Sequence, residues 1–244
     1  MGEVIRVRQL SKSYNGVPAV ENLNMVVKNG TVFGLLGANG AGKSTTIECI
    51  LGTKKADNGT VSILGMNPHT QRKQLFEQVG VQFQEANYQD KIRVGELCEV
   101  TWSLYKDAAD YQVLLEQFGI YNKSKSLVTE LSGGQRQKLF IVLALIPNPQ
   151  VIFLDELTTG LDTKARREVW KIISDLKAKG LTVLLTSHFM DEVEALCDEI
   201  CILKRGQTVF CGTVQEAISS SPYKSFEDAY LWYSDEEAEA DENI

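Results

Sequence analysis

The chain has 244 residues, of which 43% are hydrophobic and 23% charged, and its formal net charge is −7. This composition is that of a folded globular protein and excludes an intrinsically disordered chain. The length suits one compact unit with a sizeable core and an inserted subdomain. Six acidic residues in the stretch 235–242 account for nearly all of the net charge, so we expect no basic surface for nucleic acid.

Membrane spans and metal sites are not indicated by the sequence. No apolar run reaches the roughly 18 to 20 residues that a spanning helix needs, and the first residues lack a targeting signal. We therefore expect a cytoplasmic protein. The five cysteines form no CxxC pair and no pattern with histidine that would bind a metal. We interpret them as reduced thiols, most of them buried.

The first elements predict an antiparallel layer. Residues 4–10 alternate between apolar and polar, as in a half-exposed strand. Residues 25–27 and 32–36 predict two more strands, and Asn29-Gly30 between them is a strong hairpin signal. Tyr14 falls in a turn before these strands. Its ring either packs against the sheet or stacks on an adenine base, and the local sequence leaves both open.

A glycine-rich loop, GANGAGKS, covers residues 37–44 between an apolar strand and a helix that begins at Lys43. Glycines allow successive backbone N–H groups to turn inward around an anion, and the helix points its positive end at the same place. Lys43 can reach the outer phosphates of a nucleotide, and Ser44 can offer a hydroxyl to Mg²⁺. The pattern predicts a phosphate-binding loop; a glycine-rich turn with a chance Lys-Ser is the alternative.

The middle of the chain changes from strands to helices. Residues 60–65 and 79–84 predict two strands, and Gln84 ends the second one. Gln84 either caps a turn or contacts Mg²⁺ or the attacking water, because the carboxyl ends of parallel strands face the ligand. From residue 94 to 118 apolar residues recur every three to four positions. No strand pattern interrupts this block before residue 147, so we predict a helical insertion.

The insertion ends in the sequence LSGGQ at residues 131–135, which leads into an apolar helix up to residue 146. Ser132 is a preferred N-cap, and Gly133 and Gly134 open the start of the helix. This arrangement predicts a second helix terminus that can receive an anion. The chain has one phosphate loop, so the residues alone leave open what this second terminus binds.

A second strand end carries two carboxylates. Residues 151–154 are all apolar, as in a strand buried on both faces, and Asp155 and Glu156 follow directly. Buried carboxylates without a cation are costly. We therefore interpret Asp155 as a metal ligand and Glu156 as a base, against the alternative of two acids without a function.

The last third of the chain predicts a helix over residues 163–179, a buried strand over 181–186 and a final hairpin around Arg205-Gly206. His188 follows the strand directly. A lone histidine is usually structural, but one at the carboxyl end of a core strand can reach a γ-phosphate.

Together these motifs resemble the nucleotide-binding subunit of an ATP-binding-cassette (ABC) transporter over about residues 3–220. GANGAGKS is similar to the Walker A loop, VIFLDE to the Walker B strand with its glutamate, and LSGGQ to the family signature. Gln84, Asp162 and His188 fall where the family has its Q-loop, D-loop and switch histidine. Tyr14 falls where it has an adenine-stacking aromatic. The sequences TTGLD and SHFMDEVEALCDEI most resemble the subfamily that energises drug, antibiotic or polysaccharide exporters.

The resemblance implies an α/β fold: a P-loop NTPase (RecA-like) core with a mostly parallel sheet, an N-terminal antiparallel β subdomain and an inserted α-helical subdomain. We expect one ABC ATPase domain over residues 1–222, with the helical insertion at about 87–135. An aromatic segment and an acidic tail occupy 223–244. The aromatic segment either packs as a final helix against the core or contacts a partner.

The resemblance also implies ATP and Mg²⁺ as cofactors and a head-to-tail pair of subunits, either a homodimer or a pair of homologues. ATP on one Walker A loop is then covered by the signature helix of the other subunit. Lys43, Glu156 and His188 are the implied catalytic residues, and Ser44, Asp155 and Gln84 are the implied Mg²⁺ ligands. The implied nucleotide-binding residues are Tyr14, Gly37, Ala38, Asn39, Gly40, Ala41, Gly42, Lys43, Ser44, Thr45, Gln84, Ser132, Gly133, Gly134, Gln135 and Asp162.

We therefore predict an ATP-hydrolysing subunit that powers a separate integral membrane permease, for export, and lies on the inner face of the membrane through it. The alternative is a soluble ABC ATPase in assembly, repair or translation, although long coiled coils and a second cassette do not occur in this sequence. A nucleotide sensor without hydrolysis is a third possibility, against which Glu156 argues. Leu157 stands where the family usually has proline, which removes a fixed φ, and we still expect an active enzyme.

Overall fold

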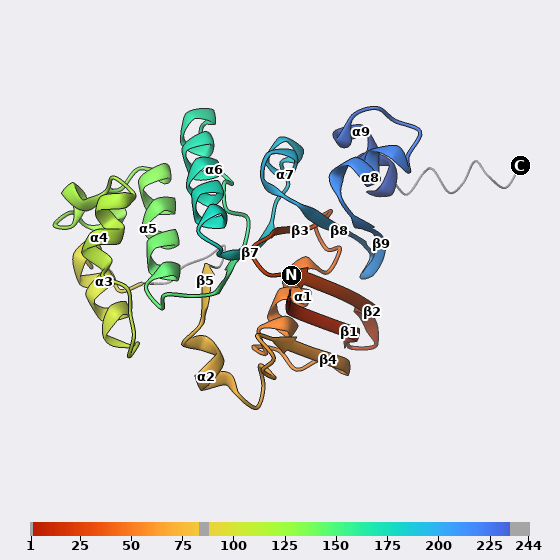
Figure 1. The fold of residues 1–244 in the computed structure, drawn as a ribbon, viewed down its shortest axis with the longest axis horizontal. Helices are drawn as coiled ribbons and strands as arrows, with labels where there is room; N and C mark the ends of the chain where they lie inside the picture. The colour runs from red at the N-terminus through yellow and green to blue at the C-terminus, as the bar shows by residue number, and fades with distance from the viewer. Residues whose placement is uncertain (1, 83–87, 235–244) are drawn as a thin grey trace, which may run out of the picture. The chain divides into compact units, whose positions relative to one another are not determined.

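The computed structural model describes residues 2–82 and 88–234 and divides into two compact units. One unit comprises Met1–Arg72 and Thr186–Ile244, and the other comprises Lys73–Leu185. The helices and strands of both units are labelled in Figure 1. The boundaries expected for one domain over residues 1–222, with its insertion at about 87–135, stay a prediction.

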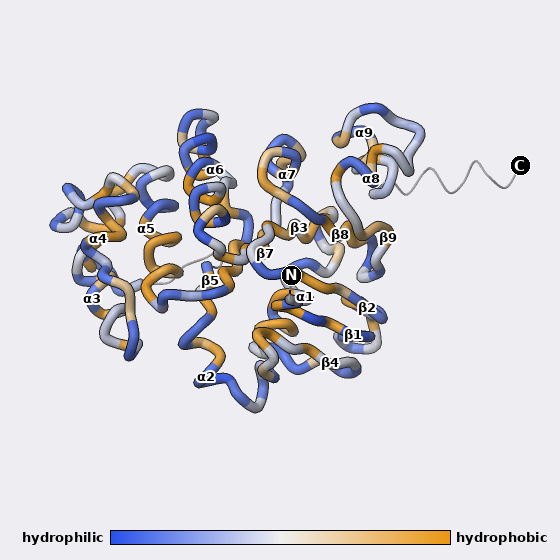
Figure 2. The backbone as a smooth tube through the Cα atoms, viewed as in Figure 1, coloured by the Kyte–Doolittle hydropathy of each residue, from blue (hydrophilic) through white to orange (hydrophobic). Residues whose placement is uncertain are grey.

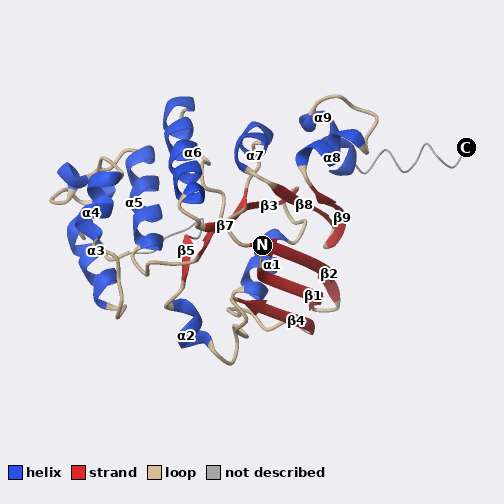
Figure 3. Ribbon diagram, viewed as in Figure 1, coloured by secondary structure: helices blue, strands red, loops and turns tan. Residues whose placement is uncertain are grey.

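The first unit contains an antiparallel sheet in the order β2-β1-β4 (Figure 3). Its strands are β1 (Glu3–Tyr14), β2 (Val17–Lys28) and β4 (Asn58–Ile63). Ile5 and Val7 of β1 are two positions apart and are both buried, as the alternating pattern predicts. The predicted antiparallel layer is therefore confirmed.

The hairpin predicted at Asn29-Gly30 is wrong. The partner of β2 is β1, and the tight turn between them is Asn15-Gly16, with φ of 51° and 81°. Two successive positive φ angles give the turn whose twist matches that of paired strands. The strand after Asn29-Gly30, β3 (Val32–Gly37), is buried at all six positions and pairs instead with β8 (Glu199–Lys204) in parallel.

The predicted final hairpin is confirmed: β8 pairs antiparallel with β9 (Gln207–Gly212). The helices of this unit are α1 (Lys43–Ile50), α7 (Met190–Leu196), α8 (Val214–Ser219) and α9 (Phe226–Ser234). Phe226 of α9 is fully buried in a cluster with Leu36 and Ile202, and the rings of Phe210 and Tyr233 lie 5.2 Å apart. The aromatic segment therefore packs as a final helix, while the acidic tail lies outside the described residues.

The second unit contains three parallel strands in the order β5-β6-β7: β5 (Val79–Gln82), β6 (Val151–Leu154) and β7 (Thr182–Thr186). Over residues 88–150 the chain forms only helices as regular elements, which confirms the predicted helical block. These are α3 (Val94–Ser103), α4 (Tyr111–Gln117) and α5 (Gly133–Leu145), with short 3₁₀ turns at Tyr121–Lys123 and Val128–Glu130. The short helix α2 (Arg72–Phe76) precedes β5.

Helix α5 organises this unit. It contacts β5, α3, α4 and α6 (Thr163–Ala178). A Cβ on Gly80 of β5 would lie 1.9 Å from the carbonyl oxygen of Ala144, so the strand approaches α5 as closely as a glycine allows. Most of α6 is hydrophilic (Figure 2), and its buried residues are Val169 and Ile173. Over residues 2–82 and 88–234, no helix has the length and apolar character to cross a membrane.

Candidate functional site

The loop over residues 37–44 follows β3 in the first unit, as predicted, and its shape depends on three glycines. Gly37, Gly40 and Gly42 have φ of 148°, 82° and 101°, which L side chains rarely adopt. A Cβ on Gly37 would lie 2.5 Å from the carbonyl oxygen of Leu203, and one on Gly42 would lie 2.3 Å from that of Ala19. The backbone of the loop is thus held between β2 and the end of β8.

Lys43 lies inside this loop. Its ammonium donates hydrogen bonds to the carbonyl oxygens of Gly37 (2.8 Å) and Ala38 (3.2 Å), and the side chain is only 6% exposed. Gly42 is the N-cap of α1 and has no side chain to cap it, and the first turn contains no acidic residue. The helix N-terminus therefore keeps the positive potential that attracts an anion. Ser44 and the loop residues 38–40 are exposed.

The turn between β8 and β9 supports the loop from behind. Arg205 and Gly206 have φ of 49° and 81°, and the N–H of Gly206 donates to the carbonyl oxygen of Ala41 (3.0 Å). The carbonyl oxygen of Gly206 in turn accepts from the N–H of Glu21 (2.8 Å). Sequence reasoning predicted this turn but not its contact with the loop, because the two segments are about 160 residues apart and no local pattern joins them.

Tyr14 is 39% exposed at the end of β1. The ammonium groups of Lys12 and Lys54 lie 5.5 and 5.3 Å from the centre of its ring. Each lysine also forms an ion pair of 2.8 Å, Lys12 with Asp57 and Lys54 with Glu48. The hydrogen bond from Lys12, followed by that from the Ser13 N–H, lowers the pKa of Asp57. An exposed ring beside two cations is compatible with the predicted stacking on a nucleotide base.

His188 is exposed, and the backbone on either side of it is fixed. The preceding Ser187 is only 2% exposed; its hydroxyl donates to the Glu192 carboxylate and accepts from the N–H of Phe189 (3.0 Å). Helix α7 begins at Met190, as predicted. The exposed His188 thus lies between the buried, hydrogen-bonded Ser187 and the start of α7.

In the second unit, Asp155 and Glu156 follow the fully buried strand β6 and are both half-buried. The N–H of Asp155 donates to the carbonyl oxygen of Gln82 at the end of β5 (3.0 Å). The implied third ligand, Gln84, lies outside the described residues. The two carboxylates therefore stand at the carboxyl edge of parallel strands, where ligands bind in α/β sheets.

Glu156 has a φ of 49°, in the left-handed region that costs a non-glycine residue roughly 1–2 kcal/mol. The next residue, Leu157, is 1% exposed. A proline at position 157 would push Glu156 toward extended backbone, so leucine suits the observed conformation. The sequence showed the missing proline but not this backbone geometry.

The signature residues form one wall of a pocket of about 350 Å³ in the second unit. Ser132 is the N-cap of α5: its hydroxyl accepts from the Gln135 N–H (3.3 Å), and the Gln135 side chain accepts from the Ser132 N–H (3.1 Å). This reciprocal capping box leaves the N–H groups of Gly133 and Gly134 at the helix start. A Cβ on Gly134 would lie 3.0 Å from the Cβ of Ala165.

The opposite wall of this pocket is the D-loop, residues 160–162, and the start of α6. Asp162 is the N-cap of α6, where its carboxylate accepts from the N–H of Ala165 (2.9 Å). Lys138 and Glu168 line the pocket as an ion pair of 2.8 Å. The structure therefore brings the predicted Ser132–Gln135 and Asp162 sites together, which the sequence placed on separate segments.

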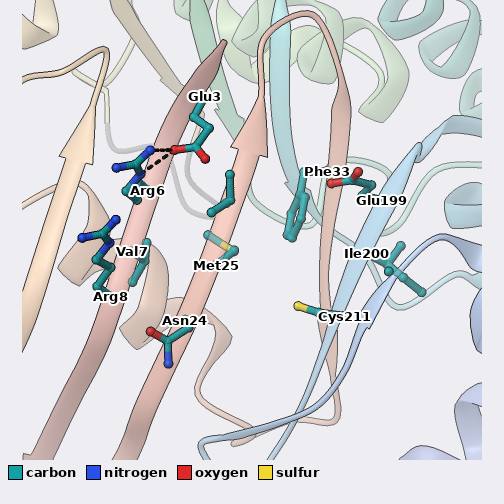
Figure 4. A pocket seen from close by; sticks show the side chains of 12 residues that line it. Glu3, Arg6, Val7, Arg8, Asn24, Met25, Phe33, Glu199, Ile200 and Cys211 are labelled. Atoms are coloured by element: carbon teal, nitrogen blue, oxygen red, sulfur yellow. Dashed lines mark hydrogen bonds and ion pairs between the residues drawn. The ribbon is translucent and has the colours of Figure 1, made fainter. Parts of the chain in front are cut away.

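A further pocket in the first unit is lined by none of these residues. It has a volume of about 460 Å³ and is lined by β1, β2 and the β8–β9 hairpin, with Arg6, Arg8 and Cys211 among its residues (Figure 4). Sequence reasoning assigned nothing to it.

Residues 20–159 match the protein family described as ABC transporter. The chain belongs to this family. It is 38% identical over 221 residues to the Nod factor export ATP-binding protein I of Burkholderia orbicola, covering 88% of this chain and 73% of that protein. It is also 38% identical over 210 residues to the protein of the same name in Rhizobium meliloti, covering 84% and 63%.

Solved structures agree with the assignment. One, described as the structure of an ATP binding subunit of an ABC transporter, superposes with a TM-score of 0.86 at 27% identity, covering 94% of this chain and 99% of that one. A second, the ADP conformation of an ATP-binding cassette, has a TM-score of 0.81 at 26% identity and covers 95% and 99%. The predicted P-loop fold is confirmed, and the chain is an ATPase subunit of the ABC transporter type. Nothing in these relatives supports the alternative in assembly, repair or translation.

Proposed function

We propose that this ABC subunit hydrolyses ATP in sites shared between two subunits and thereby powers export through a separate membrane permease. The pocket lined by Ser132 and Asp162 is the main support for a site shared between two subunits. It presents a helix N-terminus suited to an anion, yet the chain has only one loop of the GANGAGKS type. A head-to-tail pair of chains gives this second terminus a ligand, the γ-phosphate of ATP held by the partner.

In each site Lys43 neutralises charge on the outer phosphates. Its hydrogen bonds to the carbonyl oxygens of Gly37 and Ala38 hold it over the loop. The N–H groups of the loop and of Gly133 and Gly134 surround the γ-phosphate from two sides. Glu156 accepts a proton from the attacking water, and His188 holds the water and γ-phosphate in register. Phosphoryl transfer needs this positioning and charge stabilisation more than covalent help from protein.

The residues proposed for Mg²⁺ fit that ion. Ser44, Asp155 and Gln84 offer hydroxyl, carboxylate and amide oxygens, which are the hard ligands that Mg²⁺ prefers together with substrate phosphates. Among the described residues, no group of three or more His, Cys, Asp and Glu side chains could hold a metal by itself. When bound with ATP, Mg²⁺ spreads the charge that develops between the β- and γ-phosphates.

Glu156→Gln tests the role of the base. We expect the variant to bind ATP like the wild type and to lose turnover by about 10²- to 10⁴-fold. Glu116→Gln, the same change on an exposed residue of α4, is the matched control and should keep the wild-type rate. Turnover of Glu156→Gln at the wild-type rate, measured as phosphate release, contradicts the assignment.

Mixing two inactive variants tests the shared site. Lys43→Ala disables the phosphate loop, and Ser132→Asp repels the γ-phosphate while keeping a good N-cap for α5. In a mixed head-to-tail dimer one site combines both defects and the other has neither. Equal mixing should therefore restore about a quarter of the wild-type activity if the sites act independently. Sites contained within one chain predict no recovery.

The permease is proposed because the relatives are named as export ATP-binding proteins. In this proposal the subunit lies on the cytoplasmic face of the membrane and docks on the permease near residues 84–105. Purification of the tagged chain from detergent-solubilised membranes should recover an integral membrane protein. Recovery with soluble partners alone contradicts the transport role and leaves the ATPase chemistry intact.

A further inference from the structure

Two cysteines face each other across the β8–β9 hairpin. Cys201 and Cys211 are direct partners in the antiparallel ladder. Side chains of such partners lie on the same face of the sheet, with Cβ atoms about 4.5–5.5 Å apart and Cα atoms about 4.5–5.5 Å apart. A disulfide requires Cα atoms about 4.4–6.8 Å apart. The Cα spacing of this pair therefore suits a disulfide, and the Cβ atoms must approach to about 3.5–4.5 Å as the bond forms.

A β-bulge produces this register. From the tight turn at Arg205-Gly206, the ladder pairs Leu203 with Thr208, and an uninterrupted ladder would place Phe210 opposite Cys201. The register instead shifts by one residue between Ile202 and Leu203, with Val209 as the extra residue of β9. The bulge moves Phe210 opposite Ile202 and brings Cys211 opposite Cys201.

The two thiols have different environments. Cys201 is fully buried and Cys211 is exposed, and the thiols hydrogen-bond to each other. The hydroxyl of Thr208 lies 3.8 Å from the sulfur of Cys201. The hydrogen bond from Cys201 lowers the pKa of Cys211, and the same bond together with burial raises the pKa of Cys201. An exposed, activated thiol beside a buried one is the arrangement of an attacking and a resolving cysteine.

Small reagents can reach Cys211. Its sulfur points into the pocket of about 460 Å³, across from Arg6, Arg8 and Met25 on β1 and β2 (Figure 4). Arg6 is paired with Glu3, and Glu199 beside the cysteine is paired with Lys28. The Cys211 side chain therefore lines an accessible pocket of about 460 Å³, and the guanidinium of Arg8 in its lining suits a carboxylate on a small reagent.

We propose that Cys201 and Cys211 form a redox-active dithiol, which small-molecule disulfides convert to a cross-strand disulfide within the folded chain. The Cys211 thiolate attacks one sulfur of oxidised glutathione, which breaks the glutathione S–S bond and releases one glutathione thiolate. Cys201 then loses its proton and attacks the Cys211 sulfur, which releases the second glutathione. Two protein thiols are oxidised to one disulfide, and one glutathione disulfide is reduced to two thiols.

Trypsin makes the test direct, because it cuts after Lys204 and Arg205, between the two cysteines. Cys197 and Cys201 then lie in the peptide 180–204, and Cys211 lies in the peptide 206–224. The folded full-length protein is treated with oxidised glutathione, alkylated, and digested without reduction. Mass spectrometry should show these two peptides joined, and titration should show the free thiols falling from five to three.

Variants identify the sulfur that forms the bond. The joined peptides should persist in Cys197→Ser, which alters the neighbouring cysteine of the same peptide, and should disappear in Cys201→Ser. The oxidised chain should run as a monomer on a non-reducing gel. A stable glutathione adduct on Cys211 in the wild type overturns the proposal. Three other results also overturn it: a bond from Cys211 to Cys197, a bond between two chains, or a bond that forms only after unfolding.

Discussion

Gly206→Ala tests how strongly the β8–β9 turn supports the phosphate-binding loop. Gly206 has a φ of 81°, and a Cβ there would lie 2.7 Å from the carbonyl oxygen of Ala19. Gly16, in the β1–β2 turn of the same unit, has the same φ of 81°, but a Cβ there would meet nothing within 4 Å. Gly16→Ala is therefore a matched control that carries the backbone strain without the steric contact.

The expected magnitudes follow from these contacts. Gly16→Ala should cost roughly 1–2 kcal/mol of unfolding free energy, which is the cost of a left-handed alanine. Gly206→Ala adds a clash that displaces the turn and weakens two hydrogen bonds, Gly206 N–H to Ala41 and Glu21 N–H to Gly206. At about 0.5–1.5 kcal/mol each, their loss raises the cost by about 1–3 kcal/mol above that of the control.

Urea denaturation of both variants measures the difference, and binding of a fluorescent ATP analogue measures its effect on the loop. Gly206→Ala should unfold at lower urea than Gly16→Ala and should bind the analogue more weakly, because Ala41 loses the donor that fixes its carbonyl group. Gly16→Ala should bind like the wild type. Equal destabilisation by the two substitutions, with equal affinity for the analogue, refutes the reasoning.

Two other changes have defined outcomes. Ser132→Ala should cost about 0.5–2 kcal/mol through the lost N-cap of α5 and should reduce ATP turnover. Thr213→Ala removes the same type of capping box from α8 and should leave turnover unchanged, so equal losses of activity would contradict a role for Ser132 beyond capping. The hydrogen bonds from Lys12 and the Ser13 N–H lower the pKa of Asp57 in the folded chain. The ionised Asp57 therefore stabilises the fold at pH values above its usual pKa of about 3.9. This stabilisation is lost as the pH falls through the pKa of Asp57 in the folded chain. The melting temperatures of the wild type and Asp57→Asn should therefore converge in acid; a gap that is constant with pH would argue against the pair.

Features that depend on local sequence were predictable. The glycine pattern at 37–44, its position between a buried strand and a helix, and the start of α7 after His188 all follow from signals within a few residues. The N-cap at Ser132 belongs to the same class, because it is identified from its residue type and the helical pattern that follows it. Residue propensity and hydrophobic periodicity are signals that extend over only a few residues. The sequence is therefore enough to locate these elements.

Features that depend on pairing between distant segments were not predictable. Asn29-Gly30 has the composition of a hairpin, yet β3 pairs with β8, because all six of its residues are buried in a central strand. The pairing of Cys201 with Cys211 depends on the bulge at Val209. No residue type in β8 or β9 predicts that bulge. The left-handed φ of Glu156 and the hydrogen bond from Gly206 to Ala41 likewise arise from tertiary contacts that override local preference.

The support of the phosphate-binding loop by the β8–β9 turn also sets an order of events during synthesis. Strand β3 and the loop leave the ribosome long before their partners, because Phe33 pairs with Glu199 and Ala41 accepts from Gly206. About 165 residues must be translated between these partners, which takes roughly 8–33 s at 5–20 residues per second. During that interval the loop lacks the contacts that fix its backbone. The nascent chain should therefore acquire its affinity for ATP in a late, cooperative step, when the last hairpin closes against a loop made much earlier.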